Sequence, residues 1–449
     1  MKVFSPINSA ADLLASPRFR QRANTYVRWY PKTLDPNFDD RIAIPAAALV
    51  DGLYMHIPFC EAICRFCPFN KVPSNAHLIA RFVNGLCKEL EIYSTHLDLR
   101  RVRFVYLGGG TPSVLNDEQL ARIFNALKFS GVPLHTCEIS MEAHPSHLRE
   151  NTINAWHSLG INRLSTGIQA FRGEELMRLG SHHTANDVRD AMAALHAGKI
   201  SNYAIDLLYR YEGQSLADWE YTLDQTIDFQ VPHISAYALV EPSAPTFQAR
   251  VVEAEMATLL DRKLFDAGYA HYASCASGGY DYCIGGAAGV YEQSHWGAPQ
   301  ASYLGLGPGA FGFVGGVTTV NGLGIDAYCE ATKAGELPLA SAYRATKREL
   351  RRRFFVLGVK TLNVSLLAYR HEFMEDVPTD IMKTIEELCQ ENLIEASSDE
   401  IILTPLGRHF VDEISAAFFS KEQATEVHPE EPEIRRAEII RRRAKEKFR

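Results

Sequence analysis

The chain alternates short apolar runs with longer amphipathic stretches from about residue 50 to residue 240. The first pair is a strand-like run at Leu53–Ile57 and a stretch at His77–Ser94 whose apolar side chains recur with helical spacing. Further strands are predicted at Phe104–Leu107, Glu138–Glu142, Leu164–Ile168, Ile205–Leu208 and Ile234–Leu239. Helices are predicted at Gln119–Leu127, Thr152–Leu159, Ala185–Ala197 and Leu216–Asp228. Strict alternation of strand and helix predicts an α/β domain with a parallel sheet of six β/α units.

Four parts of the chain differ in pattern. Residues 1–50 are expected to form an irregular N-terminal arm, and residues 51–340 the α/β domain. Within that domain Ala270–Ser302 is rich in Gly, Ala, Ser and Tyr, and we expect a loop there over the mouth of the sheet. Residues 341–420 are expected to form a second, α+β unit. Its elements are predicted at Lys347–Gly358, Thr379–Glu391, Asn392–Leu403 and Leu406–Phe418.

The tail, residues 421–449, is polar and then basic. In a helix Ile434, Ala437, Ile440, Ala444 and Phe448 would share one face, with Arg and Lys around it. We favour a solvated terminal helix, and the alternative is peripheral contact with an anionic membrane surface.

Composition describes an ordinary globular protein. The 449 residues are 46% hydrophobic and 22% charged, and the net charge of −8 argues against nucleic-acid binding. The start of the chain lacks the apolar core of a signal peptide, and no uncharged apolar run has the length of a membrane span. We therefore expect a cytoplasmic protein, peripheral on the inner face of the membrane if the tail binds lipid.

The strongest chemical signal is a CxxxCxxC run formed by Cys60, Cys64 and Cys67. Three thiolates can hold three irons of a 4Fe–4S cluster and leave the fourth iron open for a small molecule, whereas structural zinc takes four protein ligands. The run is followed by Leu107-Gly-Gly-Gly-Thr-Pro-Ser113, which makes the signal more specific. The other six cysteines are scattered and are expected to be free thiols in a reducing compartment.

These motifs, in this order, resemble the radical S-adenosylmethionine (SAM) enzymes. The resemblance covers about residues 50–420. It is closest to the branch around oxygen-independent coproporphyrinogen III oxidase, which also holds heme chaperones, heme-opening enzymes and class C methyltransferases. It implies a partial (β/α)6 TIM-like barrel with a winged-helix-like C-terminal domain. It also implies that SAM chelates the open iron and that a donor such as flavodoxin or ferredoxin supplies the electron.

The resemblance also assigns a SAM site at the carboxyl ends of the strands, where barrel enzymes gather their active residues. Glycines there let the backbone approach a ligand, and an amide can both donate to and accept from ribose hydroxyls. Singly, each residue could be a turn or a cap, but the ordered set favours a site. The expected SAM-binding residues are Tyr54, Gly108, Gly109, Gly110, Thr111, Glu142, Gln169 and Asp206.

One position departs from the family. An arginine usually follows the glutamine by about a dozen residues, and here Ser181 stands in that place, in Leu179-Gly-Ser-His-His183. A contact to SAM is therefore lost or moved. His182, His183 or Arg178 could replace it.

Tyr303-Leu-Gly-Leu-Gly-Pro-Gly-Ala-Phe311 resembles the segment that contacts a second SAM in this branch, which nominates Gly307, Ala310 and Phe311. In class C methyltransferases the second SAM donates the methyl group, and a base near the substrate carbon must remove a proton. Tyr291, Glu292 and His295 in the expected mouth loop are the candidate catalytic residues, with Tyr282 as a further candidate.

Three functions fit this reading. The preferred one is a class C radical SAM methyltransferase that methylates an sp2 carbon of a conjugated substrate such as menaquinone. The second is tetrapyrrole chemistry, either coproporphyrinogen III oxidation or heme modification, in which Arg20, Arg22 and Arg28 could contact carboxylates. The third is a heme chaperone of the same fold. Heme chaperones read close to His-Asn-x-x-Tyr-Trp where this chain has Tyr291-Glu-Gln-Ser-His-Trp296, which weighs against the third reading.

Overall fold

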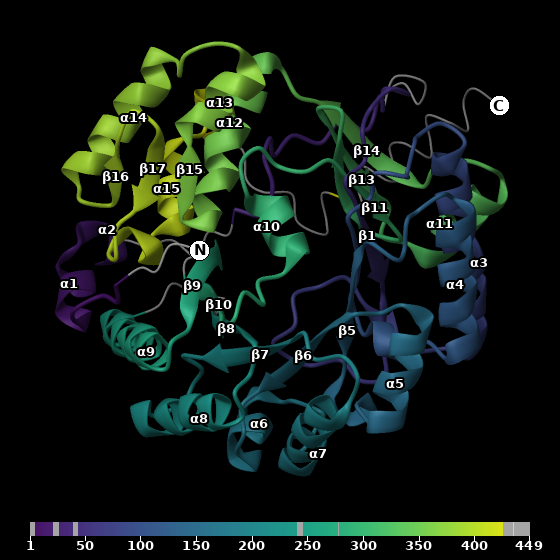
Figure 1. Ribbon diagram of the computed structural model, residues 1–449, viewed down its shortest axis with the longest axis horizontal. Helices are drawn as coiled ribbons and strands as arrows, with labels where there is room; N and C mark the ends of the chain where they lie inside the picture. The colour runs from purple at the N-terminus through teal and green to yellow at the C-terminus, as the bar shows by residue number, and fades with distance from the viewer. Residues whose placement is uncertain are drawn as a thin grey trace.

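The protein is described by a computed structural model that covers residues 5–20, 27–38, 44–239, 246–276, 278–424 and 434. A curved 12-stranded sheet runs through it in the order β14-β13-β12-β11-β1-β4-β5-β6-β7-β8-β10-β9. The sheet has two edge strands, β14 and β9, and does not close into a barrel. Figure 1 shows helices α3 to α8 on the outer side of this sheet and the C-terminal elements above its opening.

Six parallel strands form the centre of the sheet and confirm the predicted partial (β/α)6 barrel. These strands are β1 (Gly52–Ile57), β4 (Phe104–Gly109), β5 (Glu138–Ala143), β6 (Arg163–Gln169), β7 (Tyr203–Tyr209) and β8 (His233–Ala238). Their helices are α3 (Ala76–Ser94), α4 (Asp117–Phe129), α5 (Glu150–Leu159), α6 (Gly173–Leu179), α7 (Ala185–Ala197) and α8 (Leu216–Asp228). Short 3₁₀ turns follow β4 and β5, at Pro112–Val114 and Pro145–His147.

Capping explains where several of these helices begin. The side chains of Asn116, Thr184 and Ser215 each accept a hydrogen bond from the backbone N–H of the third residue of the following helix, and their own backbone N–H donates to the side chain of that residue. This reciprocal pair satisfies two backbone donors that a helix start leaves unpaired. The helices then bury their apolar faces on the sheet.

The sheet is extended on both sides by strands that the sequence pattern did not predict. Beside β1 lies the parallel strand β11, followed by three strands in antiparallel succession; beyond β8 lie β10 and β9, also antiparallel. The added elements are α9 (Phe247–Asp266), β9 (Ala270–Ala276), β10 (Gly279–Cys283), α10 (Val290–Trp296), β11 (Tyr303–Leu306), β12 (Phe311–Val314), β13 (Val317–Asn321), α11 (Ile325–Lys333) and β14 (Leu339–Arg344).

The expected loop over the mouth at Ala270–Ser302 is therefore wrong. Most of this segment is β9, β10 and α10. Its small residues and tyrosines are those of strands buried on both faces: the whole of β10 and the central residues of β9 are buried. The composition of the segment looked like a loop because such strands lack a polar face.

The C-terminal unit is α+β, as predicted, with a three-stranded sheet in the order β15-β17-β16. Its elements are α12 (Lys347–Gly358), a 3₁₀ turn at Val359–Thr361, β15 (Asn363–Ser365), α13 (Leu366–Phe373), α14 (Thr379–Gln390), β16 (Ile394–Ala396), β17 (Glu400–Leu403), a 3₁₀ turn at Gly407–His409, α15 (Val411–Ala417) and α16 (Lys421–Ala424). One hydrophobic core runs through both this unit and the barrel.

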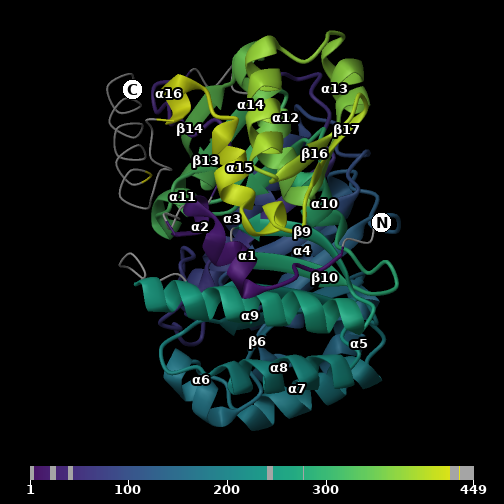
Figure 2. The same ribbon diagram turned by 90° about the vertical axis from the view of Figure 1, so that its left-hand side faces the viewer.

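The N-terminal arm is not simply irregular, because it holds α1 (Ala10–Ala15) and α2 (Pro17–Arg20). Figure 2 shows both helices between α9 and the C-terminal unit. The arm is fixed there by Phe19, whose ring meets Phe410 edge to face at 6.0 Å, and by Val27, whose N–H donates to Asp412 at 3.1 Å. Arg22 and residues 435–449 lie outside the described residues, and so does the side chain of Arg20.

Two findings bear on the tail and the membrane. Ile434 packs against Val320 and Leu323 in a small buried cluster, while the basic face expected for the tail lies outside the described residues. Among the described helices, none combines the length and the apolar character needed to cross a membrane.

Candidate functional site

The three cysteines lie on one loop at the carboxyl end of β1. We call residues 60–71 the cysteine loop; it runs from β2 (Phe59–Cys60) to β3 (Val72–Pro73), which pair with each other. Cys60 is buried, Cys64 and Cys67 are half-buried, and all three are free thiols. The N–H of Cys67 donates to the carbonyl of Cys64 at 3.4 Å and tightens the turn between them.

The inner face of the barrel holds this loop through His56. One ring nitrogen of His56 bonds the carbonyl of Asn70 at 2.8 Å, and the other bonds the hydroxyl of Tyr54 at 3.1 Å. Burial lowers the pKa of His56, so the ring is neutral and can donate from one nitrogen and accept at the other. Tyr54 thus supports the loop and lies beside Tyr106, with ring centroids 6.0 Å apart.

The thiols fit an iron–sulfur cluster better than a single ion. Among the residues described, no three His, Cys, Asp or Glu side chains converge on one ion, whereas a 4Fe–4S cluster binds each thiolate to a different iron. Burial raises the pKa of Cys60, the Thr111 hydroxyl opposes that rise by donating to its sulfur at 3.3 Å, and Cys64 and Cys67 lie close enough to act on it. Burial also raises the pKa of Cys64, and the backbone N–H of His182 opposes that rise. Buried thiols with donors aimed at their sulfurs are suited to bind as thiolates.

The glycine triplet lies directly beside the cysteine loop. Gly110 donates its N–H to the carbonyl of Ile57 at 2.9 Å, and a Cβ at Gly110 would lie 2.8 Å from backbone atoms of Ile57 and Phe59. Gly109 has a φ of 109°, and a Cβ there would also enter the ring of His56. Glycine is therefore required sterically at both positions.

Glu142 sits at the same end of the neighbouring strand. One carboxylate oxygen accepts from the Gly109 N–H at 3.0 Å and the other from the Tyr106 hydroxyl at 2.9 Å. Burial raises the pKa of Glu142 to about 7, and these two donors partly offset the rise. An ammonium or hydroxyl group bound here would donate a further hydrogen bond to this partly buried carboxylate.

Gln169 and Asp206 complete the inner face. Gln169 has a φ of 65°, which L-residues rarely adopt, and its side-chain oxygen is buried without a hydrogen-bond partner. Burial, with the nearby charge of Glu142 next in effect, raises the pKa of Asp206 well above its ordinary value. Strain, an unsatisfied acceptor and crowded carboxylates are features of a binding site more than of a packed core.

The structure shows what surrounds Ser181, which stands where the family usually has an arginine. Ser181 bonds one ring nitrogen of His183 at 3.0 Å, and the other ring nitrogen bonds the carbonyl of Ile168 at 3.0 Å. Arg178 faces elsewhere, donating to the carbonyl of Gly213 at 2.9 Å. Of the three candidate replacements, His182 contacts the cysteine loop, through the carbonyl of Ile63 at 3.2 Å.

The segment proposed for a second SAM also reaches this end. Asn70 donates to the carbonyl of Pro308 at 3.4 Å, which joins the segment to the cysteine loop. Gly307 has a φ of 93° and donates its N–H to the buried carboxylate of Glu89 at 2.8 Å, while Ala310 donates its N–H to the carbonyl of Gly307 at 3.2 Å. The ring of Phe311 lies against that of Trp29 in the arm, with centroids 4.1 Å apart and a tilt of 32°.

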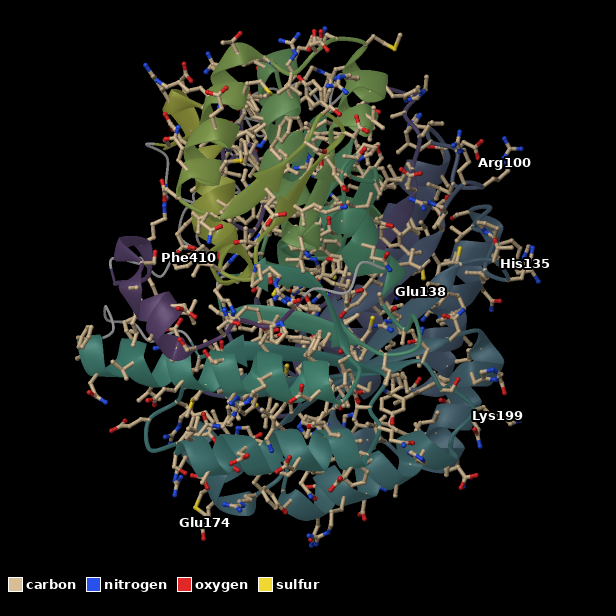
Figure 3. The ribbon with its side chains drawn as sticks, turned by 60° about the vertical axis from the view of Figure 1, so that its left-hand side comes forward. Arg100, His135, Glu138, Glu174, Lys199 and Phe410 are labelled. Atoms are coloured by element: carbon tan, nitrogen blue, oxygen red, sulfur yellow. The ribbon has the colours of Figure 1, made fainter. Side chains whose placement is uncertain are left out.

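The three candidate catalytic residues lie at the opposite end of the strands. Helix α10 packs under the amino ends: the N–H of Val290 donates to Glu138, the first residue of β5, at 2.8 Å. In Figure 3 Glu138 is labelled nearer the middle of the view than Arg100 and Lys199, which lie at its edge. Tyr291, Glu292 and His295 are thus not over the mouth, and that expectation is wrong. Their role as a base remains a prediction.

Tyr291 and His295 are in any case packed among other rings. Tyr291 stacks on Tyr106 with centroids 4.3 Å apart, and His295 is 4.1 Å from Trp296 and 4.9 Å from Tyr303. Burial lowers the pKa of His295 to about 3, so it is neutral at physiological pH. The further candidate, Tyr282, donates instead to Asp261 of α9 at 2.8 Å and turns away from the site.

Sequence reasoning missed two residues that build the site. Glu89 lies on the apolar face of α3 and accepts a hydrogen bond from the N–H of Gly307. A carboxylate among apolar residues on the buried face of a helix could have indicated a buried polar contact. Lys71 donates to the carbonyls of Cys67 and Phe69 at 2.7 and 3.0 Å. A lysine four residues after a cysteine gives no comparable signal.

Comparison with known proteins agrees with this geometry. Residues 54–226 match the family model described as the radical SAM superfamily. This segment contains the cysteine loop, the glycine triplet, Glu142, Gln169 and Asp206. The chain carries a radical SAM domain. Its cofactors are accordingly a 4Fe–4S cluster and SAM, as predicted.

The likeness extends beyond this domain. The chain is 26% identical to the heme chaperone HemW of Bacillus subtilis, over 82% of this chain and 99% of that protein, and 27% identical to HemW of Mycobacterium tuberculosis, over 81% and 93%. Among solved structures, coproporphyrinogen III oxidase (HemN) from Escherichia coli, a radical SAM enzyme, aligns with a TM-score of 0.74 and 20% identity, over 90% of this chain and 98% of that one. The fold of this chain is thus shared with HemN over 90% of its length.

Proposed function

We propose that this radical SAM protein binds heme and acts as a heme chaperone, in the manner that the name of its HemW relatives implies. The observation that carries the proposal is the extent of the match, which takes in nearly the whole of the Bacillus protein and 82% of this chain. A match of that extent includes more than the residues 54–226 that radical SAM proteins share. This proposal replaces the methyltransferase as our preferred function.

We assign the cofactors to the residues described above. Cys60, Cys64 and Cys67 would hold the cluster, and SAM would lie among Gly108, Glu142, Gln169 and Asp206. When bound, the pair supplies one-electron reductive cleavage of SAM. The chain itself orients the ligands: Thr111 and His182 fix the sulfurs, Glu142 and Gly109 present a carboxylate and a close backbone, and His56 holds the loop to the barrel.

The histidines differ in whether they could bind heme iron. His56 has both ring nitrogens bonded and His295 is buried beneath aromatic rings, so neither is free to bind heme in this conformation. His182 is exposed and lies on the rim, beside the cysteine loop. We therefore nominate His182, and not His56 or His295, as the ligand of the heme iron.

The test is anaerobic titration of the full-length, cluster-loaded protein with ferric heme, followed by the Soret band. We expect saturable binding at one site and a changed Soret maximum in His182→Ala. His157→Ala is the matched control, because His157 is on the barrel helix α5, away from the cysteine loop. Absence of saturable binding by the loaded protein would exclude the chaperone. Binding with an unchanged spectrum in His182→Ala would exclude only the ligand assignment.

A class C methyltransferase is the second candidate, favoured by one observation. The segment nominated for a second SAM lies against the cysteine loop through Asn70 and Pro308, where a methyl donor would have to sit. Incubation of the reduced protein with methyl-deuterated SAM and menaquinone tests it. A methylated quinone that retains two deuteriums, formed together with 5′-deoxyadenosine and S-adenosylhomocysteine, would support it. The electron donor and any membrane contact of the tail would then be the next properties to test.

Coproporphyrinogen III is the substrate to test alongside menaquinone. Its loss of carboxyl groups in the same incubation would favour an oxidase, a reading that the fold likeness to HemN leaves open. A flavodoxin or ferredoxin remains the donor we expect in each case. Production of 5′-deoxyadenosine without either product would leave heme handling as the function.

A further inference from the structure

Lys71 closes the cysteine loop from its far end. Its ammonium group turns back over the loop and donates to the carbonyls of Cys67 at 2.7 Å and Phe69 at 3.0 Å. The side chain is half-buried, so the charge is held beside the thiols instead of extending into water. A lysine side chain loses much rotamer freedom on being fixed in this way, and the two hydrogen bonds offset that cost.

The charge of Lys71 is held at a ligand residue, because its ammonium nitrogen lies 2.7 Å from the carbonyl oxygen of Cys67. The loop's other charged side chains are engaged by neighbouring elements: Glu61 pairs with His147 at 3.2 Å, and Arg65 lies against Gly180. Lys71 is the cation whose hydrogen bonds lie within the loop itself.

We propose that Lys71 is a positioning residue for the 4Fe–4S cluster, which fixes the cysteine loop and raises the reduction potential of the cluster. One-electron reduction adds a negative charge, and a cation held nearby in a partly buried site stabilises the reduced form. The inference rests on the cluster of the radical SAM domain and holds whichever substrate the protein takes. Its failure would therefore leave the heme proposal untouched.

The test is an EPR-monitored redox titration of the reconstituted full-length protein, with iron and sulfide content measured on the same samples. Lys71→Gln removes the charge and keeps a donor, while Lys71→Arg keeps the charge. Lys88→Gln is the matched control, because it removes an equal charge on α3, where Lys88 pairs with Glu91 at the surface.

We expect Lys71→Gln to make reduction at least tenfold less favourable, a midpoint more negative by 59 mV or more for one electron. Lys71→Arg and Lys88→Gln should stay close to the wild type. A fully loaded Lys71→Gln with the wild-type midpoint overturns the proposal.

Loss of the cluster is also decisive. If Lys71→Gln fails to load but Lys71→Arg loads, the loop needs a cation at this position and the proposal stands. If neither variant loads, the shape of lysine and not its charge is required, and the proposal is wrong.

Discussion

Gly110 offers the sharpest test of how the fold holds the cysteine loop. Its N–H bonds Ile57 at 2.9 Å and the next N–H, of Thr111, bonds Phe59 at 2.8 Å, so the glycine is clamped against the chain that leads into Cys60. In Gly110→Ala the new Cβ would lie 2.8 Å from three backbone atoms, the carbonyl oxygen of Ile57 and the nitrogen and oxygen of Phe59. Backbone atoms cannot rotate away as a flexible side chain can.

The size of the effect follows from these distances. Ordinary Cβ contacts begin at 3.4 Å, so the two segments must separate by about 0.6 Å at this point. Overpacking of this kind costs about 1–3 kcal/mol. The same movement lengthens the 3.3 Å hydrogen bond from Thr111 to the sulfur of Cys60, so we expect cluster loading to fall as well as stability.

The assay is urea unfolding of the apoprotein, together with iron and sulfide content after reconstitution. Gly173→Ala is the matched control, because a Cβ there meets its nearest neighbour at 3.9 Å, with no unusual φ. The control should be neutral or slightly stabilising, since alanine restricts the unfolded chain. Wild-type loading and an unchanged unfolding midpoint in Gly110→Ala would refute the clamp.

Three further predictions follow from buried charges. Glu142→Gln should weaken SAM binding about 10- to 150-fold, because it removes a charged hydrogen bond of about 1.5–3 kcal/mol. Anaerobic calorimetry measures this affinity, and an unchanged affinity would show that Glu142 does not bind SAM. Burial raises the pKa of Glu89 from 4.5 to about 7, so in that window the native state keeps a proton that the unfolded state has lost. The free energy of unfolding should therefore fall by up to about 3 kcal/mol as pH rises through the window, and Glu89→Gln should flatten this part of the curve in pH-dependent urea unfolding. Lys360→Met should cost about 3–5 kcal/mol by removing the ammonium partner of the buried Asp412 carboxylate, and the unfolding midpoint should be largely restored by adding Asp412→Asn.

The parallel core was predictable because each unit repeats one physical pattern. The short apolar run of β1 and the single apolar face of α3 can both be recognised from local spacing alone. Strands β9 and β10 were missed because their tyrosines and small residues do not form a run of branched apolar side chains, although most of these residues are buried. The local pattern of residues does not show which other elements will pack on each face of a strand.

The site divides in the same way. The cysteines and the glycine triplet were found because their spacing is a local property of the chain. The contact between Glu89 and Gly307 joins residues 218 positions apart, and that between Val290 and Glu138 joins residues 152 apart. Such pairs depend on the complete topology, which is why α10 was expected at the wrong end of the strands.

The contacts around the cysteine loop imply that cluster binding and folding are linked. The loop is fixed by His56 from β1, by Thr111 after β4 and by His182 beyond β6, so its geometry exists only when these parallel strands are paired. A ligand that binds only this arrangement stabilises the native state in proportion to its affinity. The cysteine loop therefore does not bind the cluster independently of the barrel. A substitution in the barrel such as Gly110→Ala changes the position of the loop and so affects cluster binding.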